Sequence, residues 1–154
     1  MRRFDLRRLR FGDGAEIWRR LPVEVEPFFF GGLAYDVPEG VVDVLLTVSR
    51  VGQRYTVVAE FEAEVTGPCQ RCLEEAHVVV AARGIEYAHF GDSEGDEEDE
   101  GYVRGYFVDL ERWVRDLLAE AMPVQLLCRE DCRGLCPICG ADLNADPGHR
   151  HDEV

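Results

Sequence analysis

Apolar and polar side chains alternate along residues 54–65, which is the period of a strand with one buried face. The preceding run, residues 41–48, is apolar on both faces, and a turn sequence at 50–54 separates the two runs. We therefore predict that these segments form an antiparallel hairpin. Residues 16–26 also alternate, and Pro22 within them favours a sheet edge because proline has no N–H to donate to a neighbouring strand.

Another apolar run at 77–90 predicts a further strand, after which the spacing of apolar residues changes to the helical period. One continuous apolar stripe then runs through 108–122: Leu110, Trp113, Val114, Leu117, Leu118 and Ala121. Asp109 is placed to cap this helix and Pro123 to end it. The sequence predicts an α+β fold: an antiparallel β-sheet of five or six strands or a partly open barrel, one covering amphipathic helix, and a C-terminal zinc-ribbon-like loop module.

At 154 residues the chain is long enough for a single domain with its own core. We expect mainly antiparallel strands at 1–90, an acidic mobile loop at 91–101, the helix at 108–122 and a Cys/His-rich metal module at 128–151. The first basic residues are not followed by an apolar run, so we expect no signal peptide, no membrane span and a cytoplasmic location.

The net charge of −14 disfavours general binding to nucleic acids, because phosphates repel an acidic surface. The charge is uneven: residues 91–101 hold seven acids, whereas residues 1–20 hold seven arginines and three acids. The basic start could supply a small RNA-contacting patch consisting of Arg2, Arg3, Arg7, Arg8 and Arg10. Alternatively, these arginines are a solvated strand edge, and the acidic run is either a solubilising linker or a contact for a basic ribosomal protein.

Four of the six cysteines lie between positions 128 and 139, and two pairs in the chain have the Cys-x-x-Cys spacing. Two thiolates at this spacing can bind one metal ion from a single tight turn. In a cytosolic protein such pairs indicate metal binding or catalysis more often than structural disulfides. The pair in CPICG is followed by Gly140, which readily adopts a left-handed backbone, whereas the pair in CQRCL has Leu73 at that position.

We predict one or two zinc ions bound by six cysteines and two histidines: Cys69, Cys72, Cys128, Cys132, Cys136, Cys139, His149 and His151. In one grouping, the four cysteines of 128–139 close a single site. In the other, the two Cys-x-x-Cys pairs share an ion, and Cys128 and Cys132 bind a second ion together with the two histidines. For the first Cys-x-x-Cys pair, incidental thiols in a hairpin turn are the alternative, and for the histidines a frayed polar tail.

Catalytic chemistry finds little support in the sequence. A thioredoxin-like thiol pair would begin a helix after a strand, whereas both pairs here lie in turn-rich or hairpin sequence. No Ser-His-Asp set, paired-carboxylate signature, phosphate-binding loop or GxGxxG motif occurs, so we expect no enzymatic activity. Iron in a four-thiolate site would instead make a rubredoxin-like electron carrier, because iron and zinc share that geometry.

The segment CQRCLE, followed about forty residues on by VDLERWVRDLLAEAMPVQLLCREDCRGLCPICGADLN, resembles the bacterial and plastid YceD family of large ribosomal RNA subunit accumulation proteins. The resemblance is most specific in GLCPICGADLN and in the helix ending AMP. Family members often carry a Cys-x-Cys pair downstream of the LN, where this chain has His149-Arg150-His151, which could preserve the ligands as imidazoles.

The resemblance implies a non-enzymatic factor that supports accumulation of 23S ribosomal RNA during ribosome assembly, with structural zinc. Its expected partners are a ribosomal protein or pre-ribosomal particle and rRNA itself, with no membrane and no small-molecule substrate. A zinc-stabilised adaptor for protein interactions unrelated to ribosomes is the alternative, and partner identity would separate the two. The iron electron carrier is a third class, which the colour of the purified protein would test.

Overall fold

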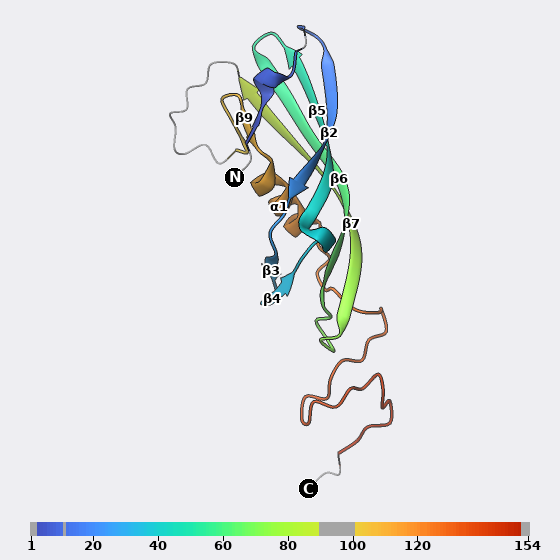
Figure 1. The fold of residues 1–154 in the computed structure, drawn as a ribbon. Helices are drawn as coiled ribbons and strands as arrows, with labels where there is room; N and C mark the ends of the chain where they lie inside the picture. The colour runs from blue at the N-terminus through green and yellow to red at the C-terminus, as the bar shows by residue number, and fades with distance from the viewer. Residues whose placement is uncertain (1–2, 11, 90–100, 152–154) are drawn as a thin grey trace.

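The computed structural model describes residues 3–10, 12–89 and 101–151, and consists mainly of antiparallel strands with one α-helix (Figure 1). This architecture agrees with the predicted α+β class. Of the acidic run expected to be a mobile loop, all but Gly101 lies outside the described residues.

A long four-stranded antiparallel sheet is the main element, with the strand order β2-β5-β6-β7. Its strands are β2 (Glu16–Glu24), β5 (Val41–Val51), β6 (Arg54–Pro68) and β7 (Glu75–His89). The predicted hairpin of the second and third strands is confirmed, and so is the edge position of the strand that contains Pro22.

Two small sheets and two 3₁₀ turns complete the strand-rich part. The β1 strand (Arg3–Asp5) pairs with β9 (Phe107–Asp109), which pairs with β8 (Val103–Arg104), and β3 (Phe28–Phe30) pairs with β4 (Leu33–Tyr35). The turns are η1 (Leu6–Arg8) and η2 (Pro38–Gly40). The expectation of five or six strands in one sheet is therefore wrong: the described strands form three sheets, because the short ones pair with each other and not with the edges of the long sheet.

The α1 helix (Leu110–Ala121) covers one face of the long sheet, which we call the inner face (Figure 1). Its predicted cap is confirmed, since the Asp109 carboxylate accepts a hydrogen bond of 3.2 Å from the Arg112 N–H. The buried side of α1 carries Leu110, Trp113, Val114 and Leu118. The indole of Trp113 packs directly over Gly84 of β7, so these elements approach closely because that position has no side chain.

Alternate residues of the long sheet define its two faces. Those on the inner face of the two central strands, such as Val44, Val57 and Ala59, are buried, and they form the core together with α1. The opposite face, which we call the outer face, carries Trp18, Glu62 and the other intervening residues, and no element of the described chain covers it in Figure 1.

His77 on the outer face should titrate at higher pH than an ordinary histidine. Its two ring nitrogens lie 2.9 Å from a Glu64 carboxylate oxygen and 3.0 Å from one of Glu75. These hydrogen bonds, that of Glu64 first, raise the pKa of His77 above 6.5. Because the folded-state pKa is raised, the interaction stabilises the fold fully below the unfolded pKa and is lost as pH rises through the folded pKa.

We expect an NMR titration of the His77 ring to give a pKa above 6.5, and Glu64→Gln to lower it. The matched change Glu62→Gln alters a carboxylate on the same face of β6 that is not an acceptor of His77, and should leave the titration nearly unchanged. A wild-type pKa at or below 6.5 would contradict the assignment.

Candidate metal centres

The first Cys-x-x-Cys pair lies in the tight turn that joins β6 to β7. The Cys69 N–H donates to the carbonyl of Glu74 at 2.7 Å, and the Leu73 N–H donates to the carbonyl of Cys69 at 2.9 Å. The Arg71 N–H points at the Cys69 sulfur at 3.4 Å. Both cysteine side chains are thus presented on one side of a rigid turn.

The second pair is held by the same two hydrogen bonds. The Cys136 N–H donates to the carbonyl of Ala141 at 2.8 Å, and the Gly140 N–H donates to the carbonyl of Cys136 at 2.8 Å. Gly140 has a φ of +74°, and Leu73 at the equivalent position of the first turn has a φ of +65°. The turn geometry expected only for the glycine-containing pair therefore occurs in both, with Leu73 in a backbone conformation that costs a branched residue roughly 1 kcal/mol.

This equivalence predicts opposite effects of two substitutions. Leu73→Gly should leave stability unchanged or raise the free energy of unfolding by up to about 1 kcal/mol, because it relieves the left-handed backbone at a side chain that is 59% exposed. Gly140→Ala should lower it by about 1 kcal/mol from backbone conformation alone, since nothing lies within 4 Å of the added carbon. Urea unfolding of the metal-loaded variants measures both, with Leu73→Ala as the control that keeps the strain.

Four cysteines from two distant parts of the chain meet in what we call the inner cluster: Cys69, Cys72, Cys128 and Cys132. The sulfurs of Cys69 and Cys132 are 3.8 Å apart, and those of Cys72 and Cys128 are 3.6 Å apart. Three of these side chains are buried and Cys128 is exposed. The cluster is joined to the core where the Gln70 N–H donates to the carbonyl of Leu126, a buried residue just after α1, at 2.9 Å.

The remaining two cysteines and both histidines form the outer cluster: Cys136, Cys139, His149 and His151. The Nε2 atom of His151 lies 3.2 Å from the Cys136 sulfur, and that of His149 lies 3.2 Å from the Cys139 sulfur. The two Nε2 atoms are 3.1 Å apart. The cluster lies near the solvent, with Cys139 and His151 exposed.

Neither grouping expected from the sequence occurs. Both placed Cys136 and Cys139 with other cysteines, whereas the structure pairs them with the histidines and places Cys128 and Cys132 with the first Cys-x-x-Cys pair. The reason is the position of the β6–β7 turn, which packs against the segment immediately after α1.

Two residues that sequence reasoning missed support the clusters. The Arg71 guanidinium donates to the carbonyl of Cys132 at 2.9 Å, and the backbone carbonyl of Arg71 accepts from the Leu135 N–H at 3.2 Å. Arg71 therefore connects the β6–β7 turn to the segments that carry both clusters. The Asn144 amide nitrogen lies 3.5 Å from the Cys132 sulfur, while its oxygen accepts from the Arg133 N–H at 2.8 Å. The asparagine of GADLN carried no metal-site signal of its own, because its role depends on the folded loop.

The electrostatics of the clusters favour thiolates at two positions. The N–H groups of Cys139 and Ile138, with the His151 ring, lower the pKa of Cys136 to about 6. Burial opposes ionisation of Cys69, but the N–H groups directed at its sulfur outweigh it and lower its pKa to about 6. Burial raises the pKa of Cys72 to about 12, so a metal ion entering the inner cluster would displace the proton of this thiol.

Both clusters fit a tetrahedral divalent ion by donor type and spacing. In each one the four ligand atoms lie within 4.8 Å of one another. Zinc–sulfur bonds of about 2.3 Å at tetrahedral angles place two sulfurs about 3.8 Å apart, close to the separations in the inner cluster. The two clusters could therefore hold metal ions, with four thiolates in the inner cluster and two thiolates and two imidazoles in the outer one.

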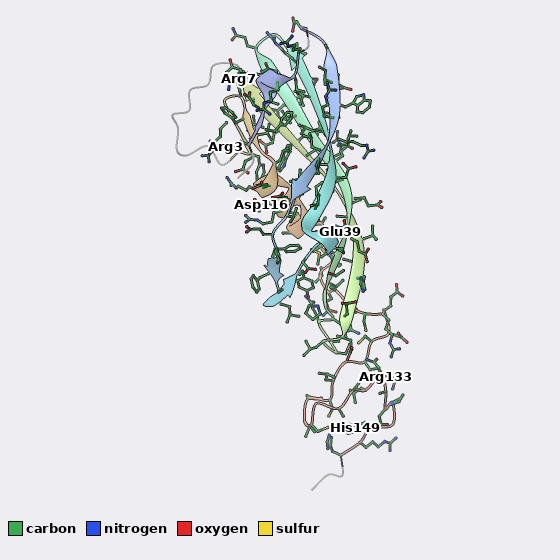
Figure 2. All side chains as sticks on the ribbon, viewed as in Figure 1. Arg3, Arg7, Glu39, Asp116, Arg133 and His149 are labelled. Atoms are coloured by element: carbon green, nitrogen blue, oxygen red, sulfur yellow. The ribbon has the colours of Figure 1, made fainter. Side chains whose placement is uncertain are left out.

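The arginines expected to contact RNA lie at the other end of the molecule, as Figure 2 shows for Arg3 and Arg7 relative to His149. Arg2 lies outside the described residues. Arg7 forms a 2.9 Å ion pair with Asp5, and its guanidinium lies 5.1 Å from the centre of the Phe107 ring. The Arg7 side chain therefore interacts with other residues of the fold.

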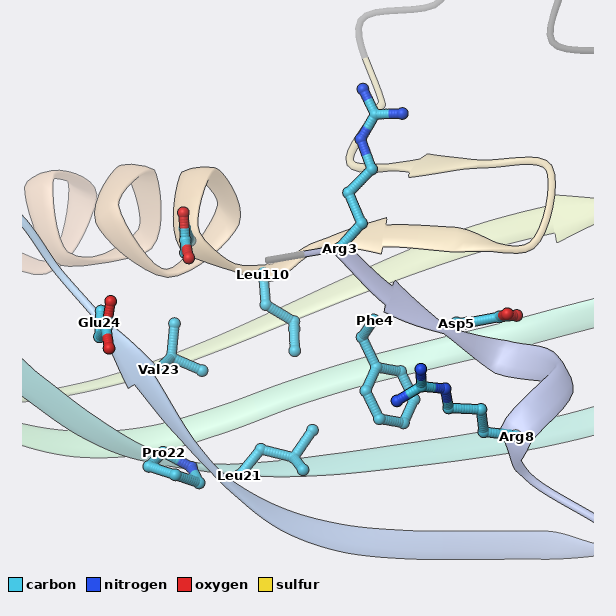
Figure 3. A pocket seen from close by; sticks show the side chains of 10 residues that line it. Arg3, Phe4, Asp5, Arg8, Leu21, Pro22, Val23, Glu24 and Leu110 are labelled. Carbon is cyan, nitrogen blue, oxygen red and sulfur yellow. The ribbon is translucent and has the colours of Figure 1, made fainter. Parts of the chain in front are cut away.

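Arg3, Arg8 and Arg10 are exposed, and the first two border a pocket of about 310 Å³ between β1, β2 and the start of α1. The apolar wall of this pocket is formed by Phe4, Leu21, Val23 and Leu110 (Figure 3). In Figure 3 Arg3 points away from the pocket and Arg8 reaches back toward Phe4. Asp5, Glu24 and Glu111 also line it, so its charge is mixed.

Among the residues that the structure describes, no helix combines the length and apolar character needed to span a bilayer. No solved structure matches the chain.

Uncharacterized proteins of Mycobacterium tuberculosis and Mycobacterium bovis are each 37% identical to this chain over 117 residues, which are 73% of this chain and 56% of each relative. One of Mycobacterium leprae is 32% identical over 73% of this chain and 54% of its own length. The chain thus spans about half the length of the curated relatives it matches.

A family comparison covers the part of the chain that contains both clusters. The model described as "Large ribosomal RNA subunit accumulation protein YceD" matches residues 57–154, which begin within β6 and include α1 and all eight candidate ligands. The match extends over more than half of the chain and includes the segments in which the sequence resemblance is most specific. The chain therefore belongs to the YceD family of large ribosomal RNA subunit accumulation proteins.

Proposed function

We propose that this protein is a non-enzymatic cytoplasmic factor that supports accumulation of large-subunit (23S) ribosomal RNA, acting in ribosome assembly on a pre-ribosomal particle. Its membership of the YceD family carries this proposal. The two clusters hold one zinc ion each, in the inner set Cys69, Cys72, Cys128 and Cys132 and the outer set Cys136, Cys139, His149 and His151.

The donor sets support a structural role for the metal. Each cluster offers four protein ligands, which is the closed coordination of structural zinc sites, whereas catalytic sites keep a position open for water or substrate. An ion in the inner cluster would fasten the β6–β7 turn to the segment after α1. An ion in the outer cluster would give the loop at 136–151, which has no helix or strand of its own, a fixed shape.

In this proposal the exposed arginines at the N-terminal end contact RNA. Arg3, Arg8 and Arg10, together with Arg2 outside the described residues, supply phosphate contacts, whereas Arg7 orders the patch through Asp5. A patch this small suits a local contact on a folded particle better than the wrapping of a long RNA, in agreement with the net charge of −14.

Deleting the gene in its host tests the function. We expect the ratio of large-subunit to small-subunit rRNA to fall and to be restored by the wild-type gene. A double variant, Arg3→Glu with Arg8→Glu, should restore it poorly, whereas Arg54→Glu, an exposed arginine on the long sheet, should restore it fully. An unchanged ratio in the deletion strain would overturn the proposed function.

Elemental analysis of protein purified without added metal tests the cofactor. We expect a colourless protein with two zinc ions per chain. A coloured protein containing iron in the inner cluster would instead favour an electron carrier, and protein without metal would overturn the zinc assignment.

A further inference from the structure

The outer face of the long sheet carries an apolar row that nothing in the described chain covers. Register places Trp18, Thr47, Val58 and Ile85 side by side on β2, β5, β6 and β7, and Tyr87 lies next to this row on β7. The row crosses all four strands, a span of about 14 Å at the usual strand spacing.

Trp18 in this row and Tyr87 beside it are both mostly exposed. Trp18 is 63% and Tyr87 67% exposed, whereas the other tryptophan of the chain, Trp113, is 2% exposed. Tryptophan and tyrosine are the residues most enriched at the centres of protein interfaces, because they bury large areas and lose little conformational entropy. Ile85 is also exposed, whereas Thr47 and Val58 between the edge strands are half-buried, so the row presents large apolar side chains on both edge strands of the face, a feature that marks an interaction surface.

Carboxylates border the apolar row. Glu60, Glu62 and Glu64 alternate along the outer face of β6, and the first two line a shallow depression of about 620 Å³ just beside the row. Arg20 pairs with Asp43 at 3.2 Å, Arg83 with Glu60 at 3.1 Å, and the His77 ring lies 2.9 Å from a Glu64 oxygen, so Glu62 is the ladder carboxylate that these cationic groups leave for an incoming ligand. Glu62 is exposed and lies in the middle of this acidic ladder.

This combination of groups selects one class of ligand. Phosphates of a nucleic acid or an anionic membrane would meet the acidic ladder, and a second copy of the chain would bring a like-charged face against it. We propose that the outer face docks an extended cationic segment of a protein partner. Apolar side chains of that segment would cover Trp18 and Ile85, and one of its arginines or lysines would pair with Glu62.

Binding of a defined peptide to the zinc-loaded full chain tests this surface. The probe is a short labelled peptide in which arginine alternates with valine, compared with a glutamate–valine peptide and a single-stranded RNA of similar length. We expect only the arginine–valine peptide to bind, measured by fluorescence anisotropy, and to protect Trp18 from quenching by acrylamide. High salt should weaken this binding, because charge pairs at the border of a surface are screened.

Two substitutions with a matched control locate the binding. Glu62→Arg and Trp18→Ala should each weaken binding on the order of tenfold, which is the effect of losing about 1.4 kcal/mol at a charge pair or an aromatic contact. Glu120→Arg makes the same charge change on the exposed side of α1 and should bind like the wild type. The metal content and circular dichroism of each variant verify that it is folded.

Four outcomes would overturn the proposal: no binding of the arginine–valine peptide, equal loss of binding in Glu120→Arg, protection of Trp18 by RNA, or protection that rises with protein concentration without peptide. The second would show nonspecific attraction, the third a nucleic-acid surface and the fourth self-association. None of these outcomes depends on whether the gene deletion alters rRNA levels.

Discussion

Replacing Cys69 by serine is expected to release the metal ion that we propose for the inner cluster and to abolish cooperative folding of the chain. Cys69 is fully buried, and its cluster joins the β6–β7 turn to the segment after α1. Zinc binding contributes roughly 10–16 kcal/mol in isolated zinc fingers, as much as the whole stability of an ordinary domain, about 5–15 kcal/mol. We therefore expect loss of most of the native circular dichroism at room temperature, or a urea midpoint far below that of the wild type.

Cys139→Ser is the matched change in the outer cluster, because Cys139 is exposed and belongs to a loop outside the core. It should remove one metal ion per chain and leave the unfolding transition of the sheet almost unchanged. Elemental analysis with urea unfolding of both variants separates the two clusters. If Cys69→Ser kept both ions and a wild-type midpoint, the inner cluster would not be a metal site on which the fold depends.

The long strands could be predicted because their alternation is uninterrupted over many residues. The run of 54–65 has apolar residues at every second position, and in β6 these same residues are buried in the core. The strands β1, β8 and β9 could not be predicted in this way, because two or three residues hold too little periodicity to be recognised. Their pairing depends on where α1 begins, since β9 ends at the Asp109 cap.

The identities of the candidate ligands could be proposed from spacing, but their grouping could not. Cys128 and Cys132 are near Cys136 in sequence, which favoured a local site, yet they face the β6–β7 turn. That turn lies beside them because β6 and β7 are long: β6 ends only at Pro68, and β7 begins at Glu75. The outer cluster then takes the histidines because Cys136 and Cys139 have no other thiols left within reach.

The alternation that predicted this strand covers residues 54–65, whereas β6 extends to Pro68. These last residues of β6 pair with β7 as far as Pro68 and Glu75. On their other side Asp36 and Thr66 exchange backbone hydrogen bonds of 2.9 and 3.0 Å, and Tyr35 lies across Gly67. The Tyr35 hydroxyl donates to the carbonyl of Pro68 at 3.2 Å. The glycine is therefore needed for a close approach, and not for a turn.

Gly67→Ala should accordingly be among the most destabilising single-methyl changes in this chain. The added carbon would lie 2.1 Å from Cδ1 of Tyr35, a ring that is 1% exposed and has no room to move away. Overpacking typically lowers the free energy of unfolding by about 1–3 kcal/mol, and we expect the upper end of this range for so close an approach to a buried ring. Because Cys69 follows two residues later, we also expect weaker retention of metal by the inner cluster, measured by competition with a chelator.

The control is Gly12→Ala, since nothing lies within 4 Å of a carbon added there, and its urea midpoint should stay close to that of the wild type. The clash itself is tested by the double variant Gly67→Ala with Tyr35→Ala. If the ring is the cause, the double variant must be less destabilised than the sum of the two single changes, because removing the ring makes room for the methyl group. Additive losses would instead mean that Gly67 is required for its backbone alone, and that Tyr35 does not hold β6 in position beside the inner cluster.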